Sequence, residues 1–259
     1  AAAEAGVEDF DAVAVGAASL LGLLPDVAPF HQSLAARLRT KVTVAASDMV
    51  TSHAGALGFQ PGAVLAAGTG AVALGTDFRD NWHRVDGWGH ILGDDGGGAW
   101  IGARGLKLAL RSIDGRVGGS VPLQQGLISL FGSKEALIQD VYTRSDRAGL
   151  LASFVPVMAS HGEEPDVRRI FEAAGAALAD TAAAALPSPL PPRLALVGGL
   201  FNATPLIRKY LLVRLTEVRP DVAVCDPEGT SLDGALQLAL RAARGEVRDT
   251  PPYVTVRRH

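Results

Sequence analysis

The chain carries, at residues 87–102, the stretch GWGHILGDDGGGAWIG. Glycines, two acids and two tryptophans crowd these residues, and such a mixture fits neither a buried core element nor a plain turn. A flat Trp88 close to the carboxylate of Asp94 is typical of carbohydrate sites, so we interpret the segment as a functional loop. Two of its residues have plainer interpretations, which we favour: core packing for Trp100 and a structural role for His90.

A second glycine turn lies upstream, between two short apolar runs at residues 63–67 and 71–75 that we predict to be strands. Gly68, Thr69 and Gly70 would then form a hairpin turn. Glycine permits close backbone approach, and successive N–H groups in such a turn can bind a phosphate, with the Thr69 hydroxyl as a further ligand. An ordinary hairpin turn explains the motif equally well.

Asp48 follows an apolar run at residues 42–46, predicted to end a strand, and precedes a predicted helix at 49–57. A carboxylate at the carboxyl end of a strand lies where α/β folds place their ligands, and it could accept a proton from a hydroxyl group. The alternative is that Asp48 caps the helix, and both roles can hold together.

A third glycine pair, Gly198 and Gly199, follows a predicted strand at residues 193–197 and precedes a helix. Such a turn lets a nucleotide approach the backbone, although many strand-to-helix turns have this composition. The chain has neither a Walker lysine motif nor a protein-kinase signature, and no His, Cys and carboxylate set has the spacing of a metal site.

Short β-branched runs alternate with long Ala- and Leu-rich helical segments, which predicts an α/β protein. Residues 99–186 hold no convincing strand, so a helical insertion is expected there. We predict two lobes. Residues 1–58 and the C-terminal helix 231–245 would make the remainder of an N-terminal lobe, and residues 59–230 a C-terminal lobe with the insertion.

The composition excludes some classes of partner. The 259 residues are 48% hydrophobic and carry a net charge of −3, without a basic cluster apart from the last three residues. Binding to nucleic acid or to a membrane surface through charge is therefore not expected. The single Cys225 rules out an intrachain disulfide and points to a reducing, cytoplasmic location.

Taken in order, these segments resemble the BadF/BadG/BcrA/BcrD-type ATPase family, in its N-acetylglucosamine kinase branch. The matching motifs are Ala46-Ser47-Asp48, Gly68-Thr69-Gly70, the stretch from 88 to 102, and Val197-Gly198-Gly199. The resemblance implies the actin-like, ribonuclease H-like, two-lobed ATPase fold of the sugar kinase and Hsp70 superfamily. It also implies an ATP-dependent kinase acting on an amino sugar, most simply N-acetylglucosamine at its 6-hydroxyl, with ATP and Mg²⁺ and no direct protein ligand to the metal.

By this resemblance Asp48 matches the catalytic base that deprotonates the sugar hydroxyl. The remaining matches fall into two groups. The phosphate- and nucleotide-binding positions are Gly68, Thr69, Gly70, Gly198, Gly199 and Ala203. The sugar-binding positions are Gly87, Trp88, Gly89, Asp94, Ala71 and Val72.

Two departures keep alternatives open. The family's Asp-Gly-Gly-rich first phosphate hairpin has no match here, so we expect it to be missing, and a non-catalytic sugar-binding or regulatory protein is then an alternative. At Ala71 and Val72 the resemblance implies small polar residues, which leaves a glucosamine kinase as another alternative. A family branch that activates other enzymes holds an iron–sulfur cluster through cysteines, and one strand-embedded Cys225 argues against it. A homodimer stays open.

Overall fold

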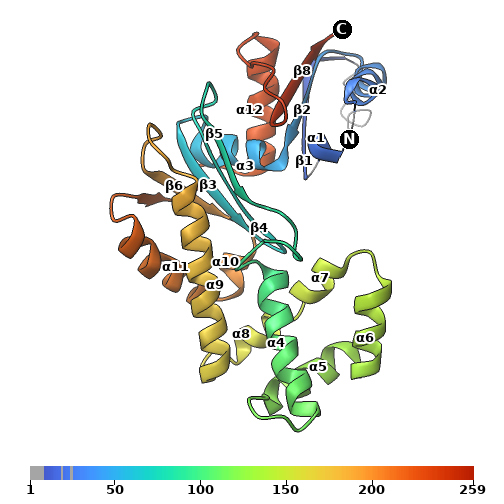
Figure 1. The fold of residues 1–259 in the computed structure, drawn as a ribbon. Coiled ribbons are helices and arrows are strands. Elements are labelled where there is room, and N and C mark those ends of the chain that lie inside the picture. The colour runs from blue at the N-terminus through green and yellow to red at the C-terminus, as the bar shows by residue number, and fades with distance from the viewer. Residues whose placement is uncertain (1–8, 19, 24–25) are drawn as a thin grey trace.

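Two β-sheets with helices on both sides make up residues 9–18, 20–23 and 26–259, the part of the chain that this computed structural model describes (Figure 1). The strands are β1 (Phe10–Ala17), β2 (Thr40–Ser47), β3 (Gly62–Ala67), β4 (Ala71–Thr76), β5 (Trp82–Asp86), β6 (Arg193–Val197), β7 (Ala223–Cys225) and β8 (Val254–Arg258). The helices are α1 (Leu20–Leu23), α2 (Ala28–Leu38), α3 (Asp48–Leu57), α4 (Gly98–Ile113), α5 (Val121–Phe131), α6 (Lys134–Thr143), α7 (Arg147–Ala152), α8 (Val155–Ser160), α9 (Pro165–Ala184), α10 (Leu200–Ala203), α11 (Pro205–Val218) and α12 (Ser231–Ala243). The predicted α/β class is confirmed.

The smaller sheet has the order β1-β2-β8. β1 and β2 run parallel, and β8 runs antiparallel to β2. β2 lies in the middle and its residues 42–46 are all buried, which accounts for its continuous apolar and β-branched sequence. α3 begins directly where β2 ends, so this sheet places Asp48 at its carboxyl edge.

The larger sheet has the order β5-β4-β3-β6-β7. β3, β4 and β5 form an antiparallel meander, whereas β6 pairs parallel to β3 and β7 parallel to β6. β3 and β6 are parallel neighbours, with Ala66 opposite Val197. The turns that follow these two strands therefore lie next to each other, at the carboxyl ends of the strands. Both predicted glycine turns are therefore side by side.

Helices α3 and α12 lie between the two sheets and pack closely on each other (Figure 1). Glycine permits this approach, because a Cβ on Gly55 would lie 1.9 Å from the carbonyl oxygen of Thr230, and one on Gly234 would lie 1.9 Å from that of Thr51. Buried Val44, Val64 and Leu238, from β2, β3 and α12, belong to one hydrophobic cluster. The two sheets thus share a core.

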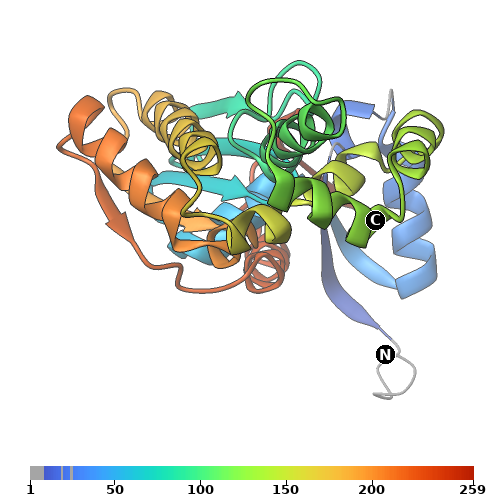
Figure 2. The same ribbon diagram turned by 90° about the horizontal axis from the view of Figure 1, so that it is seen from below.

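The helices α4–α8 gather at one end of the larger sheet (Figure 1), while α9 and α11 pack against each other beside it (Figure 2). The described residues between 99 and 186 form no strand, as expected. Phe154, Phe171 and Leu178 are fully buried in the cluster that joins these helices to the sheet. None of the described helices has the length and apolar character needed to cross a membrane.

Some predicted elements were wrong. Strands β5 and β8 were not predicted, because both carry polar residues and pair at a sheet edge, where burial is incomplete. The helical spacing of the apolar residues at 147–159 predicts one continuous helix, but the structure splits this segment into α7 and α8, since Pro156 lies in the first turn of α8 and has no backbone N–H to donate. The lobe boundaries and the missing first phosphate hairpin stay predictions, and residues 1–8 of the expected N-terminal lobe lie outside the described residues.

Candidate functional site

The Gly68–Gly70 turn is fixed against the start of α4. The N–H of Gly68 donates to the carbonyl of Gly70 at 2.9 Å and closes the turn. The N–H groups of Gly98 and Ala99 then donate to the carbonyls of Gly68 and Thr69, each at 2.8 Å. These bonds use N–H groups at the N-terminus of α4 and leave the Thr69 side chain exposed at the tip of the turn.

The carboxylate of Asp94 lies against this turn. A Cβ placed on Gly70 would be 2.4 Å from Asp94 Oδ2, so a larger residue at position 70 would require the carboxylate to move. Asp94 Oδ1 accepts a hydrogen bond from the N–H of Gly89 at 3.3 Å. Burial raises the pKa of Asp94, the negative charge of Asp86 adds to this, and hydrogen bonds from the backbone of Gly89 and Ala71 act in the opposite direction.

Trp88 is 64% exposed at the beginning of the same loop. The guanidinium of Arg84 lies 5.1 Å from the centre of its ring, and Arg84 also donates to the carbonyl of Gly87. Gly87 has a φ of 76° and lies against Val72, whose Cγ2 would be 2.8 Å from an added Cβ. Ala71 is 2% exposed. Trp88, Gly87 and the half-buried Val72 therefore lie together, whereas Ala71 packs in the core on the other face of β4, so the structure does not place this predicted sugar-binding residue at the same surface.

The glycine pair after β6 has two different surroundings. Gly198 has a φ of 110°, and a Cβ on it would lie 2.1 Å from the carbonyl oxygen of Ala67, at the end of β3. Gly199 caps α10 and would meet nothing within 4 Å, which leaves its backbone open to a ligand. Ala203, at the end of α10, is exposed.

Asp48 is the first residue of α3, and the cap is Ser47, not Asp48 as one interpretation of the sequence had it. Asp48 Oδ1 accepts from the Ser47 hydroxyl at 3.2 Å and from the N–H of Met49 at 3.0 Å. Among the described residues Oδ2 accepts no hydrogen bond. The carboxylate is held at the helix N-terminus by one oxygen and has the other available.

The family of the chain is shown by a match to a known family model. The model of the BadF/BadG/BcrA/BcrD ATPase family matches residues 1–236. The chain belongs to this BadF/BadG/BcrA/BcrD ATPase family.

Relatives of this BadF/BadG family member are named as sugar kinases. A curated N-acetylmuramic acid/N-acetylglucosamine kinase of Clostridium acetobutylicum is 32% identical over 120 residues, which are 45% of this chain and 39% of that protein. The match thus spans well under half of the curated relative. A solved structure from Chromobacterium violaceum, a candidate N-acetylglucosamine kinase, is 26% identical with a TM-score of 0.66, covering 92% of this chain and 80% of that one.

Two further structures share the fold at lower identity. A candidate N-acetylglucosamine kinase from Porphyromonas gingivalis has 21% identity and a TM-score of 0.67, covering 90% of this chain and 77% of that one. A ROK-family glucokinase from Streptomyces griseus, solved with glucose and AMPPNP, has 18% identity and a TM-score of 0.52, covering 82% and 72%. The BadF/BadG family member therefore has a mixed α/β fold that matches sugar kinases.

The structure of this BadF/BadG family member brings together most of the predicted site residues. Asp94 meets the Gly68–Gly70 turn, and Gly198 meets the end of β3 beside it. The hydrogen bonds of Asp48 within the described residues are local, and Ala203 stands one short helix away from Gly199.

Sequence reasoning missed Asp86. This residue ends β5, is 9% exposed, and accepts hydrogen bonds from the N–H groups of Asp94 and Asp95 at 2.7 and 3.0 Å. An added Cβ on Gly93 would lie 2.3 Å from Asp86 Oδ1. The available signal was an aspartate directly before a glycine, a typical turn-forming pair, at the entry to the glycine-rich loop.

Proposed function

We propose that this protein is an ATP-dependent kinase that phosphorylates an amino sugar, with N-acetylglucosamine as the first candidate substrate and its 6-hydroxyl as the acceptor. The contact between the Asp94 carboxylate and Gly70 carries the proposal, because it joins a group suited to sugar hydroxyls with a backbone turn suited to phosphate. A kinase needs these two binding functions within one site.

The sugar side of the proposal rests on Asp94, Trp88 and Val72. An ionised carboxylate accepts from two neighbouring hydroxyls, and such charge-assisted bonds are among the stronger ones in proteins. Arg84 stacks over the ring of Trp88, which is still largely exposed and can pack on the apolar C–H surface of a sugar. The apolar side chain of Val72 would accept the acetyl methyl group and offer a free ammonium no partner, which favours N-acetylglucosamine over glucosamine.

The proposed phosphate binding rests on the two glycine turns that follow β3 and β6, at the carboxyl ends of these parallel strands. ATP supplies the phosphoryl group when bound. Thr69 would bind phosphate through its exposed hydroxyl, and the open backbone at Gly199 would lie along the nucleotide. The resemblance implies Mg²⁺ without a direct protein ligand, so Mg²⁺ would bind chiefly through the nucleotide phosphates.

Asp48 is the proposed base. Its Oδ2 can accept the proton of the attacking hydroxyl, while the bonds of Oδ1 to Ser47 and Met49 hold the carboxylate in place. In phosphoryl transfer the protein mainly positions groups and neutralises charge, so a carboxylate and amide-rich turns suffice.

The sugar is tested by calorimetry on the full-length protein with N-acetylglucosamine, glucosamine, N-acetylmuramic acid and glucose. We expect the acetylated amino sugars to bind most tightly. Tighter binding of glucosamine than of N-acetylglucosamine would overturn the assignment of the substrate but not of the site.

A further inference from the structure

One cavity of the protein is separate from the candidate kinase site. It has a volume of about 670 Å³ and is lined by residues just before β3, such as Pro61, and just after β4, such as Phe78. The Gly68–Gly70 turn lies at the other end of these two strands. None of the predicted sugar, phosphate or base residues lines this cavity. Its size is that of an ordinary small-molecule site.

One wall of the cavity is aromatic. Phe59, Phe78 and Trp82 line it, with ring centres 4.4 Å apart for the first pair and 5.6 Å apart for the second. Phe59 has a φ of 64° and Phe78 a φ of 57°, in the left-handed region that bulky residues rarely adopt. The backbone of both phenylalanines is therefore strained, which costs free energy of folding. Backbone strain of this kind concentrates at functional sites.

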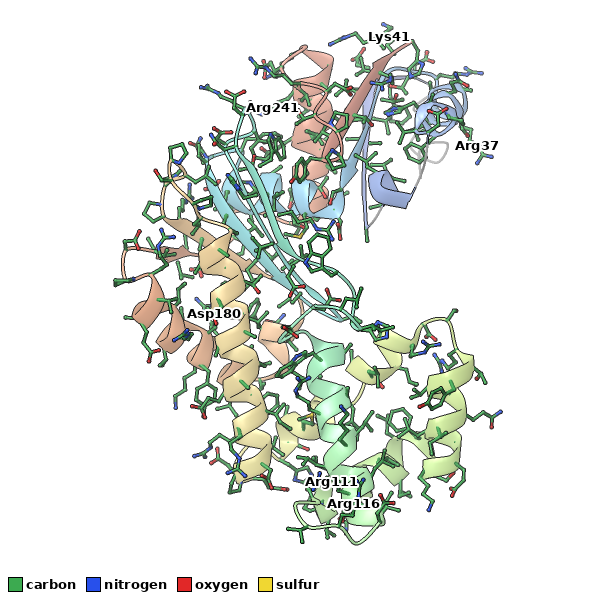
Figure 3. The ribbon with its side chains drawn as sticks, viewed as in Figure 1. Arg37, Lys41, Arg111, Arg116, Asp180 and Arg241 are labelled. Atoms are coloured by element: carbon green, nitrogen blue, oxygen red, sulfur yellow. The ribbon has the colours of Figure 1, made fainter. Side chains whose placement is uncertain are left out.

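Three arginines line the same cavity, and the guanidinium of Arg241 lies 4.4 Å from the centre of the Phe59 ring. Arg79, Arg241 and Arg248 line the cavity together with the acids Asp77 and Glu246, which leaves an excess of one positive charge. Figure 3 labels Arg241 on α12, beside the tip of the β4–β5 hairpin.

The acids in the lining are already engaged. Asp77 Oδ1 accepts from the backbone N–H groups of residues 79, 80 and 81, and Glu246 pairs with Arg241 at 3.7 Å. Arg248 pairs with Asp80 at 3.7 Å, but both side chains are more than 70% exposed, so this pair is weak and can exchange for a ligand anion.

We propose that this cavity is a second binding site, for a small cyclic organic anion. The ring would stack on Phe59, Phe78 or Trp82, and a phosphate or carboxylate group on it would meet the arginines, whose planar guanidinium groups match such anions. The cavity joins α12 and the segment before β8 to the β4–β5 turn of the other sheet, so a bound ligand would touch elements of both sheets. Nothing in the proposed kinase reaction uses this site.

Calorimetry with phenyl phosphate, inorganic phosphate and phenol on the full-length protein tests the proposal. We expect saturable binding of phenyl phosphate, weaker binding of inorganic phosphate and of phenol, and about tenfold weaker phenyl phosphate binding for Arg241→Gln and for Arg248→Gln. Arg214→Gln is the matched control, since Arg214 is an exposed helical arginine paired with Asp180 and lies outside the cavity.

Phenyl phosphate could also bind at the Gly68–Gly70 turn, and the double variant Arg241→Gln/Arg248→Gln separates the two sites. Loss of phenyl phosphate binding in the double variant, with unchanged binding of N-acetylglucosamine, supports the second site. Absence of saturable binding to the wild type, or undiminished binding to the double variant, overturns it.

Discussion

The carboxylate of Asp86 holds the backbone of Asp94, accepting its N–H at 2.7 Å. The same carboxylate accepts the N–H of Asp95 at 3.0 Å. Asp94 is thereby fixed at a φ of 57°, which a non-glycine residue seldom adopts. We infer that Asp86 is a positioning residue that aims the Asp94 carboxylate at the Gly68–Gly70 turn.

Asp86→Asn is expected to weaken sugar binding indirectly, through the backbone of Asp94, because the side chain of residue 86 does not contact the sugar. An amide in place of the carboxylate presents one N–H group to a backbone donor, and an unmade bond of this kind costs about 1–3 kcal/mol. We expect about tenfold weaker N-acetylglucosamine binding by calorimetry and faster hydrogen exchange at the amides of Asp94 and Asp95. The control is Asp80→Asn, because Asp80 is an exposed acid that precedes β5, whereas Asp86 ends this strand. Normal affinity and unchanged exchange would remove the positioning role.

Asp94→Asn is expected to weaken sugar binding about ten- to a hundredfold, since a charge-assisted hydrogen bond contributes about 1.5–3 kcal/mol. The neighbouring and more exposed Asp95→Asn should have a smaller effect. Calorimetry on both variants measures the difference, and equal losses would contradict the assignment of Asp94 to the sugar.

The same substitution should raise the stability of the unliganded protein near neutral pH. The pKa of Asp94 lies above its ordinary value of 3.8. The protonated carboxyl of Asp94 is favoured by the folded state, so its contribution to the free energy of unfolding is complete below pH 3.8. That contribution is lost as the pH rises through the raised pKa of the folded protein. Asp94→Asn removes this loss, so its melting temperature should exceed that of the wild type at pH 7 and the difference should shrink in acid. A lower melting temperature at pH 7 would show that the carboxylate stabilises the fold.

Asp48→Asn is expected to lower kcat by about 10²–10⁴-fold in the full-length enzyme, with less change in the affinity for ATP, because base catalysis contributes that much. Ser133→Ala is the control: it removes the side-chain cap of α6, in the helical insertion, and should cost about 1 kcal/mol of stability while the turnover is kept. Near-normal kcat in Asp48→Asn would make the carboxylate structural.

Gly198→Ala and Gly199→Ala should separate packing from ligand binding. At Gly198 the φ of 110° and the closeness of Ala67 predict a loss of more than about 1 kcal/mol in the free energy of unfolding. At Gly199 no atom lies within 4 Å of an added Cβ, so stability should change by less than about 0.5 kcal/mol. Only a nucleotide would meet that methyl group, so Gly199→Ala should weaken ATP binding. Denaturant titration and nucleotide binding measure both effects, and unchanged ATP affinity in Gly199→Ala would contradict the nucleotide role.

His53 should make the protein sensitive to acid. Its ring is fully buried, and burial lowers its pKa from 6.5 to about 4. Stability is therefore complete above pH 6.5 and falls by about 3 kcal/mol as the pH drops towards 4. His53→Gln, which can still donate to the carbonyl of Gly62, should flatten this dependence, whereas His83→Gln on β5 should not. Buried His31, whose pKa is also lowered, adds a loss in the same direction, so an unchanged slope in His53→Gln would assign the acid sensitivity to other groups.

Strands β2, β3, β4 and β6 were predictable because burial gives them uninterrupted apolar runs, and β5 was not, because its edge position admits polar residues. The glycine turns were predictable as turns from the sequence. Their proximity in space was not, because it depends on the parallel pairing of β3 with β6. Asp86 illustrates what sequence alone misses. The pair Asp86-Gly87 indicates a turn, but the hydrogen bond from the N–H of Asp94 to the Asp86 carboxylate depends on a loop that folds back over eight residues.

Detection of the phosphorylated sugar tests the central claim most directly. Full-length protein is incubated with ATP, Mg²⁺ and N-acetylglucosamine, and the product is identified by mass spectrometry and ³¹P NMR, with Asp48→Asn in parallel. The account predicts N-acetylglucosamine 6-phosphate and ADP in equal amounts from the wild type, and a product rate lower by about 10²–10⁴-fold from the variant. ATP hydrolysis without any sugar phosphate, across N-acetylglucosamine, glucosamine, N-acetylmuramic acid and glucose, would contradict it.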